Sequence, residues 1–267
     1  MINAVMKFIG GLFFFLVCVI NSLSAYNLRQ VTNSDGLTSS AVLSLLQDSN
    51  GFLWMGTCDG VNIYDGTKAY SWNGWGQLNL SGYIIEEILE THDGVIWVQT
   101  NYGLSKVDKE KRLVVDYPQF KGSYMMVKNE LGDLFFFSSS NLLYAFNEKK
   151  QEFYRLPIGT LDREDIVNLY VNEHYLIIFL KNEIIYYQMK HSPEGEYTLS
   201  TINTSEKTEV RYGFGDKNQV YWLDKDYNLF GYSLDKPVKK LICNWKEALD
   251  GRGTIVDIPV SYTHLTL

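Results

Sequence analysis

The chain has 267 residues, of which 46% are hydrophobic and 21% charged, and it contains only 5 prolines. This composition excludes a disordered, collagen-like or coiled-coil protein, and the length suits a single all-β barrel or propeller. Lysine and arginine together number 24 against 31 aspartates and glutamates, which gives a net charge of −7. Because sequence-independent binding of nucleic acid needs clustered positive charge, we expect no nucleic-acid partner.

The N-terminus has the pattern of an export signal. Lys7 precedes an apolar run of 13 residues, Phe8 to Ile20, and Ala25 provides a small residue at the cleavage point. A membrane-spanning helix needs about 20 apolar residues, so this run is short for an anchor. We therefore predict a signal peptide at residues 1–25, with an uncleaved anchor as the alternative.

The next part of the chain indicates four short strands joined by tight turns. Strands are predicted at Val42–Gln47, Phe52–Thr57, Val61–Tyr64 and Lys68–Trp72. The first two turns contain Asn-Gly and Asp-Gly, dipeptides that form hairpin turns because glycine adopts positive φ at little cost. Four consecutive strands of this length are typical of one propeller blade.

The same pattern recurs along the chain. Gly51, Trp54, Thr57 and Gly60 are matched by Gly94, Trp97, Thr100 and Gly103, and each pair lies 43 residues apart. Weaker copies align Phe135, Ile177 and Trp222 with Trp54, so that successive steps are 43, 38, 42 and 45 residues. They also place Asn141 and Asn228 where Gly60 stands. Because an aromatic residue at the Trp54 position would be buried between blades, we interpret the repeated tryptophans and glycines as structural.

A period near 42 residues with four strands per period predicts an all-β fold, a β-propeller built from four-stranded blades. Residues 26–258 would form about five blades, with Thr254 to Ile258 as the first strand of a sixth. We expect an incomplete, truncated ring and a chain that is a fragment of a longer protein. Residues 259–267 fit no blade and form a non-repeat tail that could be foreign sequence.

The motif from Asp48 to Asp65, preceded by Asp35-Gly36-Leu37-Thr38-Ser39-Ser40, resembles the two-component-regulator propeller repeat. That family forms the periplasmic sensor regions of bacterial hybrid two-component system histidine kinases, and the resemblance covers about residues 26–258. It implies a periplasmic propeller that binds oligosaccharides. Because this chain has no kinase module, it implies the N-terminal part of a receptor that reaches the inner membrane only through a missing C-terminal part. The full receptor is expected to be a homodimer.

The sequence offers little for catalysis. The four histidines stand in no metal-ligand motif, and no nucleophile or nucleotide-binding motif occurs. Glu86 and Glu87 are adjacent on a predicted strand, so their side chains point to opposite faces and do not form a catalytic pair. Cys58 and Cys243, the cysteines beyond the leader, are expected to be free thiols. We expect no enzyme activity, no catalytic residue, no metal and no cofactor.

Binding is better supported, because loops at one end of the blades carry aromatic residues among glycines and asparagines. A loop aromatic presents an apolar face for a sugar ring while neighbouring amides bond its hydroxyls. An arginine would pair with an acidic group. The alternative interpretation is that these side chains only cover loops or pack on the adjacent blade. The candidate ligand-binding residues are Trp72, Trp75, Tyr83, Tyr102, Tyr124 and Arg211.

Our leading hypothesis is a non-catalytic, ligand-sensing propeller that binds an oligosaccharide and signals by shifting between two receptor states. Two alternatives stay open. An exported propeller enzyme, a glycosidase or polysaccharide lyase, requires acid and base groups around the central opening. A protein-binding structural propeller requires a broad apolar patch in place of a polar, aromatic-lined pocket.

Overall fold

The computed structural model describes residues 30–72, 80–111, 113–202, 206–236 and 238–248. These residues are almost entirely in strands, turns and loops. Within them, the helical elements are the 3-10 turns η1 (Asn33–Asp35) and η2 (Pro118–Phe120) and the short helix α2 (Trp245–Ala248). The predicted signal peptide, the strand expected at residues 254–258 and the tail at 259–267 lie outside the described residues.

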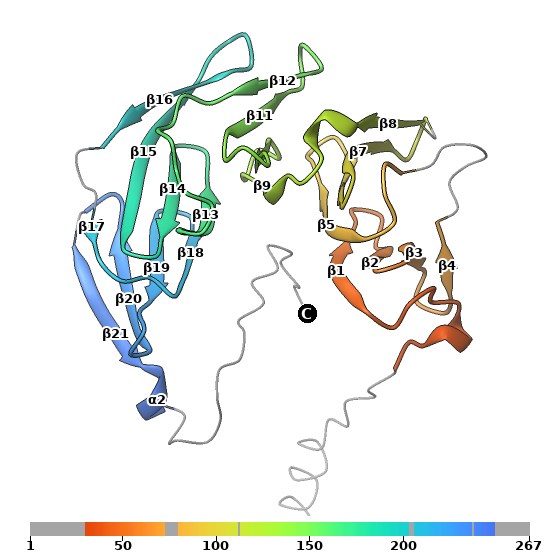
Figure 1. Ribbon diagram of the computed structural model, residues 1–267, viewed down its shortest axis with the longest axis horizontal. Coiled ribbons are helices and arrows are strands. Elements are labelled where there is room, and N and C mark those ends of the chain that lie inside the picture. Colours follow the sequence, from red (N-terminus) through yellow and green to blue (C-terminus); the bar gives the residue numbers. More distant parts are fainter. Residues whose placement is uncertain (1–29, 73–79, 112, 203–205, 237, 249–267) are drawn as a thin grey trace, which may run out of the picture. The chain divides into compact units, whose positions relative to one another are not determined.

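The strands form five antiparallel sheets, each made from strands that follow one another along the chain (Figure 1). Sheet 1 contains β1 (Val42–Gln47), β2 (Leu53–Thr57), β3 (Gly60–Tyr64) and β4 (Ala69–Ser71). Sheet 2 contains β5 (Ile85–Glu90), β6 (Ile96–Thr100), β7 (Gly103–Asp108) and β8 (Leu113–Tyr117). Sheet 3 contains β9 (Tyr124–Lys128), β10 (Leu134–Phe137), β11 (Leu143–Asn147) and β12 (Glu152–Arg155).

Sheet 4 contains β13 (Ile166–Val171), β14 (Tyr175–Leu180), β15 (Glu183–His191) and β16 (Tyr197–Thr201), and the short β17 (Glu206–Lys207) also pairs with β15. Sheet 5 contains β18 (Tyr212–Asp216), β19 (Gln219–Leu223), β20 (Asn228–Ser233) and β21 (Lys239–Asn244). The first strand of each sheet contacts the first strand of the next, as in consecutive propeller blades. The predicted fold class, an all-β propeller of four-stranded blades, is confirmed, and the five described sheets agree with a partial propeller.

The turns of sheet 1 show why this sequence forms a blade. Gly51 and Gly60 adopt φ of 86° and 89°, a backbone conformation that favours glycine. The carboxylate of Asp48 accepts hydrogen bonds from the backbone N–H groups of Asn50 and Phe52 at 3.0 and 2.9 Å, which closes the β1–β2 turn. The indole N–H of Trp54 donates to the same carboxylate at 2.9 Å, so the turn also fixes the buried tryptophan.

Hydrophobic clusters fill the space between neighbouring sheets. Trp54 packs against Ile85 and Ile88 of sheet 2, and Trp97 meets the rings of Phe146 and Phe153 of sheet 3 at centroid distances of 4.8 and 5.6 Å. Burying a large apolar side chain contributes about 2–3 kcal/mol, so these tryptophans stabilise the junctions between sheets.

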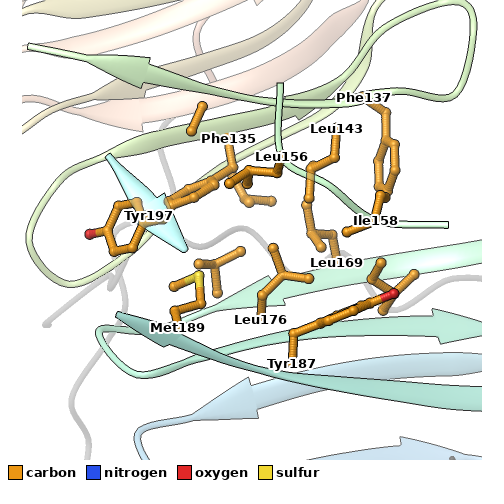
Figure 2. Packing of buried hydrophobic residues seen from close by; sticks show 14 of the residues in the cluster. Phe135, Phe137, Leu143, Leu156, Ile158, Leu169, Leu176, Tyr187, Met189 and Tyr197 are labelled. Carbon is orange, nitrogen blue, oxygen red and sulfur yellow. The ribbon is translucent and has the colours of Figure 1, made fainter. Parts of the chain in front are cut away.

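The junction of sheets 3 and 4 has the same construction with smaller residues. Figure 2 shows Phe135 and Leu143 of sheet 3 opposite Leu169 and Leu176 of sheet 4, with Tyr197 at one side. The first four of these residues are fully buried. Apolar side chains on both faces of the central strands thus join the sheets into one structure.

In sheet 5, the residue equivalent to Trp54 lies one position away from the Trp222 that the repeat spacing predicted. Trp222 is buried, but its cross-strand partner is Gly213, where an added Cβ would lie 2.2 Å from the ring of Phe179 in sheet 4. Trp222 therefore faces the preceding sheet, whereas Trp54 and Trp97 face the following one. Tyr221 occupies the equivalent position in sheet 5, because its pairing with Gly231 has the same spacing as the pairing of Phe135 with Ala145 in sheet 3.

A recurrent irregularity marks the first strands of sheets 1 to 4. The pairing of the first two strands shifts register in each of these sheets, for example between Val42 and Ser44 and between Ile166 and Asn168. In sheets 1 and 4, the residue that follows the register shift forms a hydrogen bond to the first strand of the next sheet. The hydroxyl of Ser44 accepts from the backbone N–H of Ile88 at 3.0 Å, and the amide of Asn168 donates to the carbonyl of Gly213 at 2.6 Å.

Candidate functional site

Each sheet has two ends, and four of the predicted binding residues lie at the same one. Since the strands are antiparallel, the loop before the first strand and the turn between the second and third strands lie at the same end. We call this the leading end and the opposite one the trailing end. Tyr83, Tyr102, Tyr124 and Arg211 all belong to leading-end segments or to the first residue of a first strand.

Tyr83 and Tyr102, called the tyrosine pair below, come together at the leading end of sheet 2. Their ring centroids lie 6.3 Å apart with an interplanar angle of 48°. The two side chains are 55% and 44% exposed, although most large hydrophobic residues of the strands are buried. Two tilted and exposed aromatic rings on adjacent loops are suited to contact the apolar face of a sugar.

The backbone beneath the tyrosine pair is firmly held. The carbonyl of Tyr83 accepts from the N–H of Gly60 in sheet 1 at 2.7 Å, and the N–H of Asn101 donates to the carbonyl of Ile84 at 3.1 Å. The loop packs so closely at Gly82 that an added Cβ would lie 2.5 Å from the side-chain oxygen of Asn101. The rings are thus presented on an ordered surface, which lowers the entropy lost when a ligand binds.

A cation on the loop between sheets 2 and 3 extends the same surface. The ammonium group of Lys121 lies 4.7 Å from the ring centroid of Tyr102. Lys121 follows η2, whose Phe120 is buried in the junction of sheets 2 and 3. The packing of Phe120 therefore positions the lysine, and the site draws on two sheets.

Polar side chains lie next to this surface on the first two strands of sheet 2. The amide of Gln99 donates to the carboxylate of Glu86 at 2.8 Å and to the carbonyl of Ser123 at 3.0 Å. Glu86 is exposed, whereas Gln99 and Ser123 are only 3% and 1% exposed. Sequence reasoning used Glu86 only to argue against a catalytic pair, and it missed Lys121 and Gln99 because their proximity to the loops depends on the packing of two sheets.

A second network supports the loops of sheets 1 and 2 with the same 43-residue offset. The hydroxyl of Thr38 bonds the amide of Asn62 at 2.7 Å and lies 3.3 Å from the hydroxyl of Thr57. In sheet 2 the equivalent hydroxyls belong to Ser81, Thr100 and Ser105, with separations of 3.0 and 3.1 Å from Ser81. A comparison of residues 43 positions apart in the sequence could have identified this network, which holds the leading-end loops to their own sheets.

Tyr124 has a largely structural environment in sheet 3. Its ring stacks on Phe137 at 5.5 Å, its hydroxyl donates to Asn141 at 2.8 Å, and the guanidinium of Arg163 lies 4.2 Å from the ring. Burial raises the pKa of the Tyr124 phenol, and the charge of Arg163 opposes this shift only in part. These contacts leave less of the ring free for a ligand than at Tyr102.

Arg211 belongs to sheet 5 and has a partner that sequence reasoning did not identify. It donates to the hydroxyl of Tyr227 at 2.7 Å, and its guanidinium lies 4.7 Å from the same ring, as does the ammonium of Lys246. Tyr227 has φ of 65°, so it takes the backbone conformation that the alignment assigned to Asn228. The one-residue offset of sheet 5 explains this difference.

Trp72 lies apart from the tyrosine pair. Trp72 is half-buried and packs on Trp54 with ring centroids 5.3 Å apart, and its backbone N–H donates to the carbonyl of Val61 at 2.7 Å. Its position at the junction of sheets 1 and 2 favours a packing role. Trp75 lies outside the described residues, so its binding role stays a prediction.

Over the described ranges, no group of three or more His, Cys, Asp and Glu side chains has the arrangement of a metal site. Cys58 and Cys243 are free thiols. No helix in these ranges has the length and apolarity needed to span a bilayer.

The fold and the loop surface define a β-propeller with a candidate ligand site at one end of its blades. The sequence of residues 36–59 matches the family described as two component regulator propeller, which confirms the resemblance over the first two strands of the first blade. The search of curated protein sequences found no significant match.

Solved structures of low sequence identity share this fold. The extracellular domain of a hybrid two-component system from B. thetaiotaomicron is 16% identical, with a TM-score of 0.51, 81% of this chain covered and 37% of that chain. Virginiamycin B lyase from Staphylococcus aureus is 11% identical, with a TM-score of 0.53, 80% of this chain covered and 73% of that chain. This chain thus covers 37% of the extracellular domain of the hybrid two-component system.

Proposed function

We propose that this chain is the ligand-sensing propeller of a periplasmic receptor and that it binds an oligosaccharide at the leading end of sheet 2. The observation that carries the proposal is the tyrosine pair, whose rings are exposed and 6.3 Å apart on hydrogen-bonded loops. The match of residues 36–59 to the two-component-regulator family supports a sensing role. The tyrosine faces supply apolar contact, and the adjacent polar groups supply hydrogen bonds to hydroxyls.

The cellular setting belongs to the same proposal. A leader at residues 1–25 would export the chain to the periplasm, and the parent receptor would be a homodimer anchored in the inner membrane. Sugar binding would favour one of two arrangements of that receptor and so control a histidine kinase outside this chain. The effect on the kinase would be limited by the difference between the sugar's affinities for the two arrangements.

A non-catalytic role fits the carboxylates near the site. The side chain of Glu86 bonds Gln99, toward sheet 3, whereas the side chain of Glu87 bonds Ser44 of sheet 1. The two carboxylates therefore diverge, and they lack the facing arrangement that a glycosidase uses. Likeness to a lyase at 11% identity concerns the fold and gives this chain no lyase chemistry.

Calorimetric titration of the purified chain tests the proposal. The panel would contain tetrasaccharides of glucose, mannose, xylose and galactose, trigalacturonate, a chondroitin sulfate tetrasaccharide and the trimer of glucosamine. We expect saturable binding of at least one oligosaccharide without cleavage products. Tyr102→Ala and Tyr83→Ala should each weaken that binding about 5- to 10-fold, since an aromatic contact contributes on the order of 1 kcal/mol.

Tyr70 provides the matched control. It is 54% exposed and also contacts a lysine, Lys68, but it lies on the outermost strand β4. Tyr70→Ala should leave binding unchanged. Cleavage products would instead establish an enzyme, and absence of binding to every sugar would favour a protein-binding propeller.

A further inference from the structure

At the junction of sheets 2 and 3, two buried polar side-chain atoms form no hydrogen bond with the described residues. Over the described residues, neither the side-chain oxygen of Gln99 nor the hydroxyl of Ser123 has a hydrogen-bond partner. Both side chains are more than nine-tenths buried. A buried polar group without a partner costs about 1–3 kcal/mol in other proteins, so such groups call for an explanation by function.

The orientation of the Gln99 amide is fixed by its neighbours. Both hydrogens of its nitrogen are used, one toward the carboxylate of Glu86 at 2.8 Å and one toward the carbonyl of Ser123 at 3.0 Å. Exchanging the amide nitrogen and oxygen would place an oxygen against two other acceptors. The remaining side-chain oxygen of Gln99 is therefore an acceptor that needs a donor.

The chemistry of the three side chains selects the ligand group. The carboxylate of Glu86 and the oxygen of Gln99 accept hydrogen bonds, and the hydroxyl of Ser123 donates or accepts. A carboxylate or sulfate on the ligand would donate nothing and would be repelled by Glu86. A ligand cation would be attracted by Glu86 but repelled by Lys121, which precedes Ser123 by two residues on the same loop, so these two charges together do not favour a cation. A neutral group with two donors meets these requirements.

We propose that Glu86, Gln99 and Ser123 form a subsite for two adjacent hydroxyl groups of a neutral pyranose. One hydroxyl donates to Gln99 and exchanges a hydrogen bond with Ser123, and the other donates to Glu86. Glu86 is exposed, whereas the other two side chains are buried, so the proposal includes a movement of the Glu86 side chain that gives the sugar access to Gln99 and Ser123. This subsite rests on the proposed function, of which it specifies the ligand class.

The subsite is continuous with the tyrosine pair. Glu86 follows Tyr83 by three residues, a distance of about 10 Å in extended chain. Lys121 connects the other side, since it contacts the ring of Tyr102 at 4.7 Å and lies on the loop of Ser123. An oligosaccharide can contact the tyrosine rings with one unit and the subsite with another, whereas a monosaccharide reaches only one of them.

Ser123→Ala separates the subsite from a structural role. Removing a hydroxyl that has no partner should leave the melting temperature of the free protein unchanged or slightly raised. The same change should weaken binding of the neutral tetrasaccharides about 10-fold, which corresponds to the loss of one hydrogen bond. Glu86→Gln should weaken binding by a similar factor, and Glu164→Gln, at an exposed glutamate before β13 of sheet 4, should not.

The outcomes distinguish this inference from the proposed function. Wild-type binding that is equally strong in Ser123→Ala and Glu86→Gln would overturn the subsite and leave the sensor intact. Preference for trigalacturonate, chondroitin sulfate or the glucosamine trimer would overturn the neutral ligand class. A melting temperature several degrees lower in Ser123→Ala would show a structural hydrogen bond and also overturn the subsite. Failure of the wild type to bind any oligosaccharide would contradict both proposals.

Discussion

The ammonium group of Lys109 in sheet 2 lies 3.0 Å from the carboxylate of Asp48 in sheet 1, although 61 residues separate them. The same ammonium lies 2.7 Å from the carboxylate of Glu90, and the three side chains are only 14%, 1% and 10% exposed. Glu90 also accepts from the backbone N–H of Ser49 at 2.7 Å. This cluster joins the trailing ends of the first two sheets.

Lys109→Met should destabilise the protein by about 3 kcal/mol, because it leaves two largely buried carboxylates without their cation. Chemical denaturation monitored by tryptophan fluorescence measures the effect. Lys111→Met is the control, since Lys111 bonds Asp108 with a side chain that is 78% exposed, and it should change stability negligibly. Equal effects of the two substitutions would show that the Lys109 cluster is not a structural junction.

The same cluster should make stability fall in acid. Burial of Asp48 disfavours its ionised form, but hydrogen bonds from Trp54 and Lys109 outweigh burial and hold the pKa of Asp48 below its usual 3.8. Because the pKa is lower in the folded state, the stabilisation is present above about pH 4 and is lost as the pH falls through the folded-state value. Asp48→Asn should reduce the loss of unfolding free energy in acid, measured by denaturation at pH 2 to 5. An unchanged dependence on pH would contradict the assignment of this loss to Asp48.

Glu87 should produce the opposite dependence near neutrality. Burial raises the pKa of Glu87 from 4.5 to about 7, and the hydrogen bond with Ser44 offsets only part of this effect. The protonated form is favoured by folding, so the contribution of Glu87 to stability is greatest below about pH 4.5 and is lost as the pH rises through 7. Glu87→Gln should therefore stabilise the protein at pH 8, on the order of 2 kcal/mol, and not at pH 4.

The matched control for this prediction is Glu86→Gln. Glu86 is the adjacent residue and is exposed, so its substitution should leave the pH dependence of unfolding in place. If the decrease of stability with rising pH disappeared in Glu86→Gln but not in Glu87→Gln, the titrating group would be Glu86 and the assignment to Glu87 would be wrong.

Gly213→Ala should destabilise the junction of sheets 4 and 5. An added Cβ would lie 2.2 Å from the ring of Phe179, so the sheets would have to separate at a cost of about 1–3 kcal/mol. Gly159→Ala is the control, because nothing lies within 4 Å of its added Cβ. Thermal unfolding of both variants measures the difference, and equal melting temperatures would contradict the close approach of β18 to sheet 4.

The blade architecture could be predicted from sequence where local chemistry determines it. The predicted strand Val42–Gln47 coincides with β1, because Asp48 and Gly51 form a turn whose hydrogen bonds lie within five residues. Sheet 5 could not be aligned correctly, because Tyr221 and Trp222 are adjacent aromatic residues that both fit the apolar pattern, although they lie on opposite faces of the sheet. Sequence spacing alone does not reveal such a one-residue change in pairing.

The candidate site was predictable only in part. Tyr83 and Tyr102 could be proposed because both occupy loops at the end of one blade. Gln99 lies inside a strand, and Ser123 follows a 3-10 turn of the next sheet, so their contact arises from blade packing. Trp72 illustrates the converse, since a tryptophan beside a glycine-rich loop is half-buried against Trp54.

The crystal structure of the chain with the most tightly bound neutral tetrasaccharide tests the central claim most directly. The account predicts one sugar ring in contact with Tyr83 and Tyr102, and adjacent hydroxyls of another unit within hydrogen-bond distance of Gln99 and Glu86. A sugar bound at the trailing ends of the sheets, or on their outer strands, would contradict it.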